Sequence, residues 1–178
     1  DLAQGKSVLD VFCHVGGFGL AAMAKGAASV TCVDGSQPAL NLASRGAVAT
    51  RAETPFEAIK GDAFDVMGQL AGQGKTYELV ICDPPAFAPQ KAAREAGLRA
   101  YERVARLASA LVAEGGYLTL CPCSPAAGLE RFRAACIRGI GRAGGQAPRL
   151  HHGGAGPAPA HHLGRLDTRH TSSCGCCV

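Results

Sequence analysis

Two cysteines stand two residues apart in the stretch GGYLTLCPCSPAA, residues 115–127, where an apolar run ends. A cysteine thiolate can act as a nucleophile or bind a metal, and a buried thiol can fill space in a core. Structural zinc sites usually separate paired cysteines by two to four residues, a spacing that CPC does not have. The spacing disfavours a metal site. Cys123, just past the run, is the candidate nucleophile, a structural thiol is the alternative, and Cys121 lies deeper in the run.

A second motif, VICDPPAF at residues 80–87, places Asp83 directly after another apolar run. Pro84 and Pro85 stiffen the backbone and leave carbonyl oxygens free to accept hydrogen bonds. The ring of Phe87 can stack on a planar base, which suits an enzyme that acts on an unstacked nucleotide. A strand exit followed by a core phenylalanine would show the same pattern.

The turn DVFCHVGGFG, residues 10–19, has glycines that would let a ligand approach the backbone near the start of a helix. Its spacing does not match the G-x-G-x-x-G of nicotinamide enzymes, although Asp34 is well placed to bind ribose hydroxyls. A tight turn without a ligand is the alternative.

Short β-rich runs alternate with helix-length segments, which predicts a doubly wound parallel sheet with ligands at the carboxyl ends of its strands. The expected strands span residues 7–12, 29–34, 58–62, 77–83 and 117–121, and the expected helices 18–25, 38–45, 64–71, 98–112 and 129–142. We expect a polar cleft where four acids meet at one sheet edge, namely Asp10, Asp34, Asp62 and Asp83.

Composition narrows the class of protein. The 178 residues are 47% hydrophobic and contain no apolar run long enough to span a membrane, and a cytoplasmic protein with reduced cysteines is expected. Residues 91–149 carry ten Lys and Arg against four Asp and Glu. Arg99, Arg103 and Arg106 would share one helix face, either as a solvated surface or as a nucleic-acid contact.

In chain order, the motifs VLDVFCHVGGFG, VTCVDGS, GDAF, VICDPPAF and GGYLTLCPCS resemble class I S-adenosylmethionine-dependent methyltransferases. More specifically, they resemble bacterial large-subunit ribosomal RNA cytosine-C5 methyltransferases, through the combination of DPPAF with C-x-C-S. The resemblance covers about residues 6–145. It implies a Rossmann-like α/β fold with a mostly parallel sheet, S-adenosylmethionine as cofactor and large-subunit rRNA as partner.

The resemblance also implies roles for individual residues. Cys123, the cysteine directly before serine, would be the nucleophile, and Asp83 would share in catalysis. Pro84, Pro85 and Phe87 would meet the target base, and Arg99 and Arg103 the RNA. The cofactor would bind to Phe12, Gly16, Gly17, Asp34, Gly35, Ser36, Asp62, Ala63 and Asp83.

The chemistry of cytosine favours the same cysteine. C5 is a poor nucleophile until a thiolate adds to C6, after which C5 can take a methyl group and the thiolate leaves. Transfer to an exocyclic amine, which needs the DPPAF motif but no cysteine, is a second interpretation. A fragment that binds cofactor or RNA without catalysis is a third.

The sequence departs from the family in the glycine turn and near both ends. His14 and Val15 replace the usual aromatic or hydroxyl residues of the turn. We expect the family's N-terminal RNA-binding domain to be absent. We expect a methyltransferase core over residues 1–146 and a Gly-, Pro-, His- and Cys-rich tail over 147–178. With an incomplete C-terminal sheet edge, low stability and reduced or absent activity are expected.

Overall fold

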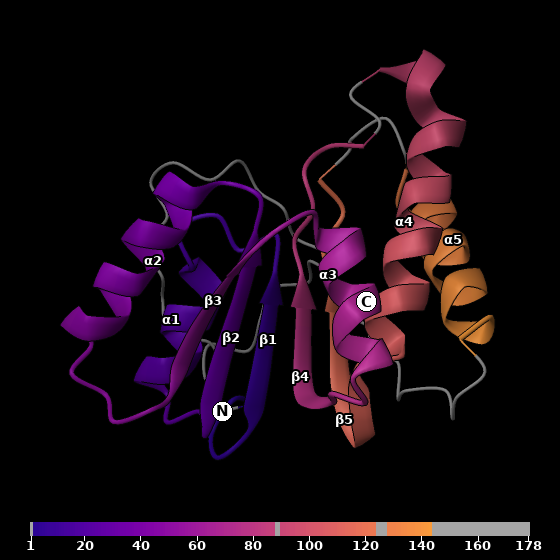
Figure 1. Cartoon of the computed structure of the whole chain (residues 1–178). Coiled ribbons are helices and arrows are strands. Elements are labelled where there is room, and N and C mark those ends of the chain that lie inside the picture. Colours follow the sequence, from indigo (N-terminus) through magenta and orange to yellow (C-terminus); the bar gives the residue numbers. More distant parts are fainter. Residues whose placement is uncertain (1, 88–89, 124–127, 144–178) are drawn as a thin grey trace, which may run out of the picture.

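The computed structural model describes residues 2–87, 90–123 and 128–143, which form a five-stranded parallel sheet flanked by helices (Figure 1). The strand order is β3-β2-β1-β4-β5. The strands are β1 (Ser7–Val11), β2 (Ser29–Asp34), β3 (Phe56–Lys60), β4 (Tyr77–Cys82) and β5 (Val112–Leu120). The helices are α1 (Gly17–Ala24), α2 (Gln37–Ala49), α3 (Ala63–Gly72), α4 (Arg94–Ser109) and α5 (Leu129–Gly141), with a short 3-10 turn, η1 (Lys91–Ala93), before α4.

The sheet is covered on both faces, which explains why β1, β2 and β4 are almost continuously apolar. Alternate side chains of a strand point to opposite faces. Leu9 and Val11 of β1 pack in the core under α3, α4 and α5, whereas Val8 packs in the core under α1 and α2. The chain order reverses between β1 and β4, and in such sheets the ligand crevice lies at the carboxyl ends of the strands beside this switch point.

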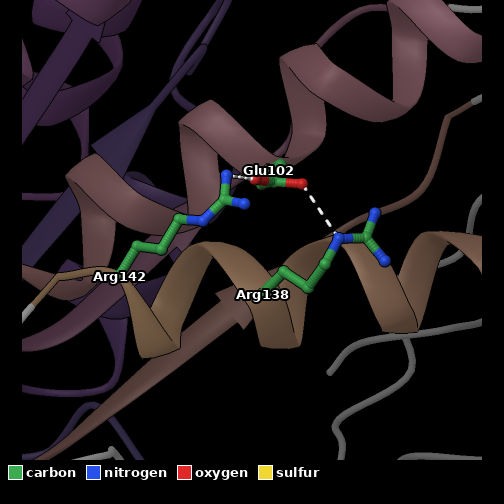
Figure 2. Close-up of polar contacts among 3 residues, drawn as sticks. All are labelled: Glu102, Arg138 and Arg142. Atoms are coloured by element: carbon green, nitrogen blue, oxygen red, sulfur yellow. Dashed lines mark hydrogen bonds and ion pairs between the residues drawn. The ribbon is translucent and has the colours of Figure 1, made fainter.

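Helices α4 and α5 lie against each other and are joined by charge as well as by apolar packing. Glu102 of α4 forms ion pairs with Arg138 of α5, at 3.1 Å, and with Arg142, the C-cap residue of α5 (Figure 2). Gly139 lets the helices approach closely, because a Cβ there would collide with the backbone of α4 at Glu102. This pair of helices forms the outer layer beside β4 and β5.

The predicted fold class is confirmed, and the described strands are all parallel rather than mostly parallel. Several predicted boundaries are wrong, and the largest differences lie in α4 and β5. Helix α4 ends at Ser109 and does not reach Val112, which begins β5. Strand β5 contains a bulge, since Tyr77 pairs with Val112 but Leu79 pairs with Tyr117, and Gly115 and Gly116 lie within this irregular stretch.

The third strand also differs from the prediction. β3 ends at Lys60, and Asp62 belongs to the start of α3 rather than to the strand. The predicted boundary at residues 146–147, the tail and the incomplete sheet edge lie outside the described residues. No described helix is long and apolar enough to cross a membrane.

Candidate active site

A cavity of about 470 Å³ lies at the carboxyl ends of β1, β2 and β4. Two of its lining residues, His14 and Gly61, were not among the predicted site residues. The predicted residues that it brings together are Phe12, Asp34, Gly35, Asp62, Ala63, Asp83 and Pro85. Segments far apart in the chain thus supply one site, as the topology of the sheet requires.

The loop after β1 is held over the cavity by Asp34. Its Oδ2 accepts a hydrogen bond from the backbone N–H of His14 at 2.8 Å, and its Oδ1 accepts one from Ser36 at 2.8 Å. Phe12 and His14 have left-handed backbone conformations, with φ of 61° and 49°, which is uncommon for residues with side chains. Such strain persists only where surrounding contacts enforce it, and it often marks ligand sites.

Asp62 closes the cavity from the side of α3. It is the N-cap of that helix, and its Oδ1 accepts hydrogen bonds from Phe64 N–H at 2.9 Å and Asp65 N–H at 3.3 Å. The cap fixes the direction of the carboxylate, which is exposed to the cavity.

Asp83 and Cys123, the two predicted catalytic residues, meet in the structure. The thiol Sγ of Cys123 donates a hydrogen bond to Asp83 Oδ1 at 3.0 Å. Asp83 follows β4 and Cys123 follows β5, and the neighbouring backbones are joined by a bond from Cys121 N–H to Cys82 C=O at 2.9 Å. Asp83 also lines the cavity, so the sulfur lies beside it.

Tyr101 of α4 holds the backbone of Cys123 in place through a hydrogen bond. The backbone N–H of Cys123 donates to the Tyr101 hydroxyl at 3.2 Å, and the tyrosine is only 2% exposed. Its ring packs edge-on against Phe87 at 5.1 Å and Phe132 at 4.9 Å between centroids. No sequence motif marked Tyr101, because its role depends on how α4 docks under the end of β5.

Some residues of the DPPAF motif are buried in the core, and others line the cavity. Pro84 is buried, Pro85 is exposed and lines the cavity, and Phe87 is half-buried. The ring of Phe87 packs against Phe12 at 6.2 Å and Phe64 at 6.1 Å. The motif therefore builds an aromatic wall next to the cavity.

Five other predicted residues lie outside the cavity lining. Gly16 is buried with φ of 82°, and a Cβ there would lie 2.9 Å from Cβ of Ala43, so this glycine packs α1 against α2. Gly17 begins α1, and Ser36 caps α2 by accepting a hydrogen bond from Ala39 N–H. Arg99 is exposed on α4. Arg103 lines a different cavity.

Asp10 does not contribute to the cavity, contrary to the expected row of four acids. It is fully buried, and its Oδ2 accepts a hydrogen bond from Gly19 N–H at 2.8 Å, which ties β1 to α1. Burial raises the pKa of Asp10 to about 7, with smaller contributions from Asp83 and Asp34. The cleft is formed by the other three acids.

The other described cysteines are buried, as expected for small hydrophobic residues. Burial raises the pKa of the Cys82 thiol and raises that of Cys136 to about 12, so both stay protonated. Cys123 is the half-exposed member of the described set. Within residues 2–87, 90–123 and 128–143, no cluster of three His, Cys, Asp or Glu side chains is arranged to hold a metal.

A doubly wound sheet with an acid after β2 and a polar cavity at the switch point defines an α/β enzyme that binds a nucleoside-containing cofactor. A family model for S-adenosylmethionine-dependent methyltransferases matches residues 1–152, and the chain belongs to that family.

Known relatives agree with this family. The chain is 35% identical over 162 residues to a ribosomal RNA large subunit methyltransferase of Deinococcus radiodurans, covering 90% of this chain and 39% of the relative. It is 36% identical over 122 residues to ribosomal RNA large subunit methyltransferase I of Aeromonas hydrophila, covering 68% of this chain and 31% of that protein. The chain thus spans well under half the length of these relatives.

Solved structures show the same fold. A methyltransferase complexed with SAH, S-adenosylhomocysteine, superimposes with a TM-score of 0.69 and 25% identity, covering 79% of this chain and 37% of the other. A SAM-dependent methyltransferase from Agrobacterium tumefaciens gives a TM-score of 0.64 and 23% identity over 77% of this chain and 44% of its own.

The donor set of the cavity fits S-adenosylmethionine, the cofactor of this family. Asp34 presents a carboxylate that can accept hydrogen bonds from a ribose diol, and Phe12 and Ala63 add apolar surface to the same cavity. The cofactor carries a sulfonium and an ammonium group. The carboxylates of Asp34, Asp62 and Asp83 match that positive charge.

Proposed function

We propose that this chain is the catalytic core of an enzyme that methylates C5 of a cytosine in large-subunit ribosomal RNA, with Cys123 as the nucleophile. The observation that carries the proposal is the 3.0 Å hydrogen bond from Cys123 Sγ to Asp83 Oδ1 beside the cofactor cavity. A thiol aimed at a carboxylate and partly open to solvent has the placement of an activated nucleophile.

The proposed reaction begins at the cysteine. Asp83 accepts the thiol proton and passes it to N3 of the cytosine while the sulfur of Cys123 forms a bond with C6. C5, now enamine-like, takes the methyl group. When bound in the cavity, S-adenosylmethionine would supply that methyl from its positively charged sulfur, with S-adenosylhomocysteine as the by-product. Loss of the C5 proton to solvent then breaks the S–C6 bond, and the N3 proton returns through Asp83 to the thiolate.

The other residues orient and enclose the reactants. Asp34 and Asp62, fixed by backbone N–H groups, hold the ribose and adenine side of the cofactor. Pro85 and the aromatic wall behind it form a platform for a flipped base, which is stabilised by stacking on aromatic or apolar side chains. Tyr101 fixes the backbone of Cys123.

The relatives from Deinococcus and Aeromonas support rRNA as the substrate, because both are named as large-subunit rRNA methyltransferases. The identity of the product tests the proposal. The full chain and its Cys123→Ala variant are incubated with undermodified large-subunit rRNA and labelled cofactor, and the nucleosides are separated by mass spectrometry. The proposal expects 5-methylcytidine from the full chain and none from the variant.

An exocyclic-amine methyltransferase would give a different result. Its chemistry uses carbonyl oxygens of the DPPAF motif and needs no thiol, so the Cys123→Ala variant would keep its activity and the product would carry the methyl on nitrogen. Cofactor binding with no methylated product from either protein would favour a non-catalytic binding fragment.

A further inference from the structure

A second cavity, also of about 470 Å³, lies between α3 and α4. Helix α3 contributes Phe64, Asp65 and Gln69, and α4 contributes Arg103 and Arg106. It is next to the active site, since Phe64 directly follows Ala63 of the cofactor cavity and its ring packs edge-on against Phe12 at 6.1 Å. Both arginines are exposed.

Within the described part of the chain, neither of these two arginines forms an ion pair. By contrast, Arg138 of α5 and Arg142 at its C-terminus bind Glu102 (Figure 2), and Arg131 lies 3.6 Å from Glu95. Among the described residues, no carboxylate lies within ion-pair distance of Arg103 or Arg106, although Asp65 lines the same cavity. Two arginines against one aspartate leave a net positive charge in this cavity and a local positive potential.

One of the two guanidinium groups is already fixed in place. The guanidinium carbon of Arg103 lies 4.5 Å from the centroid of the Phe64 ring, a cation–π contact. Stacking leaves the edge of a guanidinium, with its N–H donors, free to bind an acceptor. Arg106 lies one helical turn further along α4 and faces the same space.

We propose that this α3–α4 cavity binds a backbone phosphate of the RNA strand a few nucleotides from the target base. Arg103 and Arg106 would donate hydrogen bonds to the phosphate oxygens, as guanidinium groups do in nucleic-acid complexes. A strand whose target base lies against Pro85 passes the aromatic wall formed by Phe12, Phe64 and Phe87, in which Phe12 lines the cofactor cavity and Phe64 lines the α3–α4 cavity. The inference rests on the proposed RNA substrate and adds a site for its backbone.

The test measures RNA binding by fluorescence anisotropy, using a labelled single-stranded RNA of about twelve nucleotides, between about 50 and 200 mM KCl. The test variant is Arg103→Gln with Arg106→Gln. The matched control is Arg45→Gln with Arg51→Gln, which removes the same charge from the side of the sheet covered by α2. Among the described residues, neither of these arginines has a carboxylate partner. Melting temperature and cofactor affinity confirm that each variant is folded.

Removing one cation that binds a phosphate of a single strand lowers the slope of log K against log salt by about 0.7, so the double variant should lower it by about 1.4. Its affinity should fall roughly tenfold at the lowest salt, and the control should keep the slope of the wild type. Asp65→Asn should tighten binding, because it removes the negative charge opposite the arginines. The single variant Arg106→Gln leaves the Phe64 contact intact and should show half of the slope change.

Two results would overturn the inference, and they differ in what they imply for the function. If the wild type binds and methylates RNA while the test and control variants behave alike, the cavity is not an RNA contact and the proposed function stands. If the wild type binds no RNA at all, both the phosphate site and the proposed function are wrong. A variant that melts early is replaced by Arg106→Gln, for which an unchanged slope is equally decisive.

Discussion

Replacing Asp10 by asparagine should change how the stability of the protein depends on pH. Asp10 is fully buried, and its Oδ1 has no hydrogen-bond partner among the described residues. Burial raises its pKa from 3.8 to about 7. The native state therefore holds a proton that the unfolded chain has already lost, and stability falls as pH rises from about 4 to about 7.

The size of the effect follows from the pKa values. A rise from 3.8 to about 7 corresponds to roughly 4 kcal/mol of lost stability above pH 7, of which about 2.5 kcal/mol is lost between pH 5 and pH 8. Asparagine keeps an oxygen for the Gly19 N–H but buries an amide NH₂ without a partner, at a cost of about 1–3 kcal/mol. The free energy of unfolding of Asp10→Asn should therefore exceed that of the wild type by about 1–3 kcal/mol at pH 8, and this difference should disappear by pH 5.

Urea unfolding followed by circular dichroism at pH 5, 6, 7 and 8 measures this difference. The exposed acid Asp65 supplies the control, since Asp65→Asn should shift the stability by a similar small amount at every pH in this range. Groups that titrate in both proteins cancel when the two curves are subtracted. A difference between wild type and Asp10→Asn that stays constant from pH 5 to pH 8 would refute the raised pKa.

Two further predictions concern the glycine turn and the support of the nucleophile. Gly16→Ala should lower the free energy of unfolding in urea by about 1–3 kcal/mol, because φ is 82° and the new Cβ would collide with Ala43. Gly17→Ala should be nearly neutral, because a Cβ there has nothing within 4 Å, and equal costs for the two variants would contradict this account. Tyr101→Phe should reduce the turnover number more than it changes the KM for RNA and should alter the rate at which iodoacetamide alkylates Cys123, because the hydroxyl fixes the Cys123 backbone. Unchanged turnover and alkylation would show that the ring alone matters.

Much of the fold could be predicted from the sequence because buried parallel strands leave a strong signal. The runs that contain Val8, Val30 and Val80 are bounded by turn residues and are apolar on both faces. The boundary at Val112 could not be found in this way. Leu111 and Val112 continue the apolar pattern of α4, and Gly115 and Gly116 in the bulge resemble a turn. The start of β5 is set instead by the pairing of Val112 with Tyr77 of β4, which the local sequence does not show.

The site was partly predictable for a similar reason. Asp34 and Asp83 follow apolar runs, and parallel strands bring their carboxyl ends to one edge of the sheet. The same argument fails for Asp10. This acid also lies in an apolar strand, but its side chain is buried and accepts a hydrogen bond from Gly19 N–H of α1. The hydroxyl of Tyr101 depends on helix packing across the core, which leaves no local pattern.

Covalent trapping tests the central claim, that Cys123 attacks C6 of the target cytosine. RNA that contains 5-fluorocytidine is incubated with the full chain and S-adenosylmethionine, and the protein is analysed by denaturing gel and mass spectrometry. Fluorine at C5 cannot leave as a proton does, so the S–C6 bond should persist and the adduct should map to the peptide that contains Cys123. A Cys123→Ala variant that still forms 5-methylcytidine, or an adduct on another cysteine, would contradict the account.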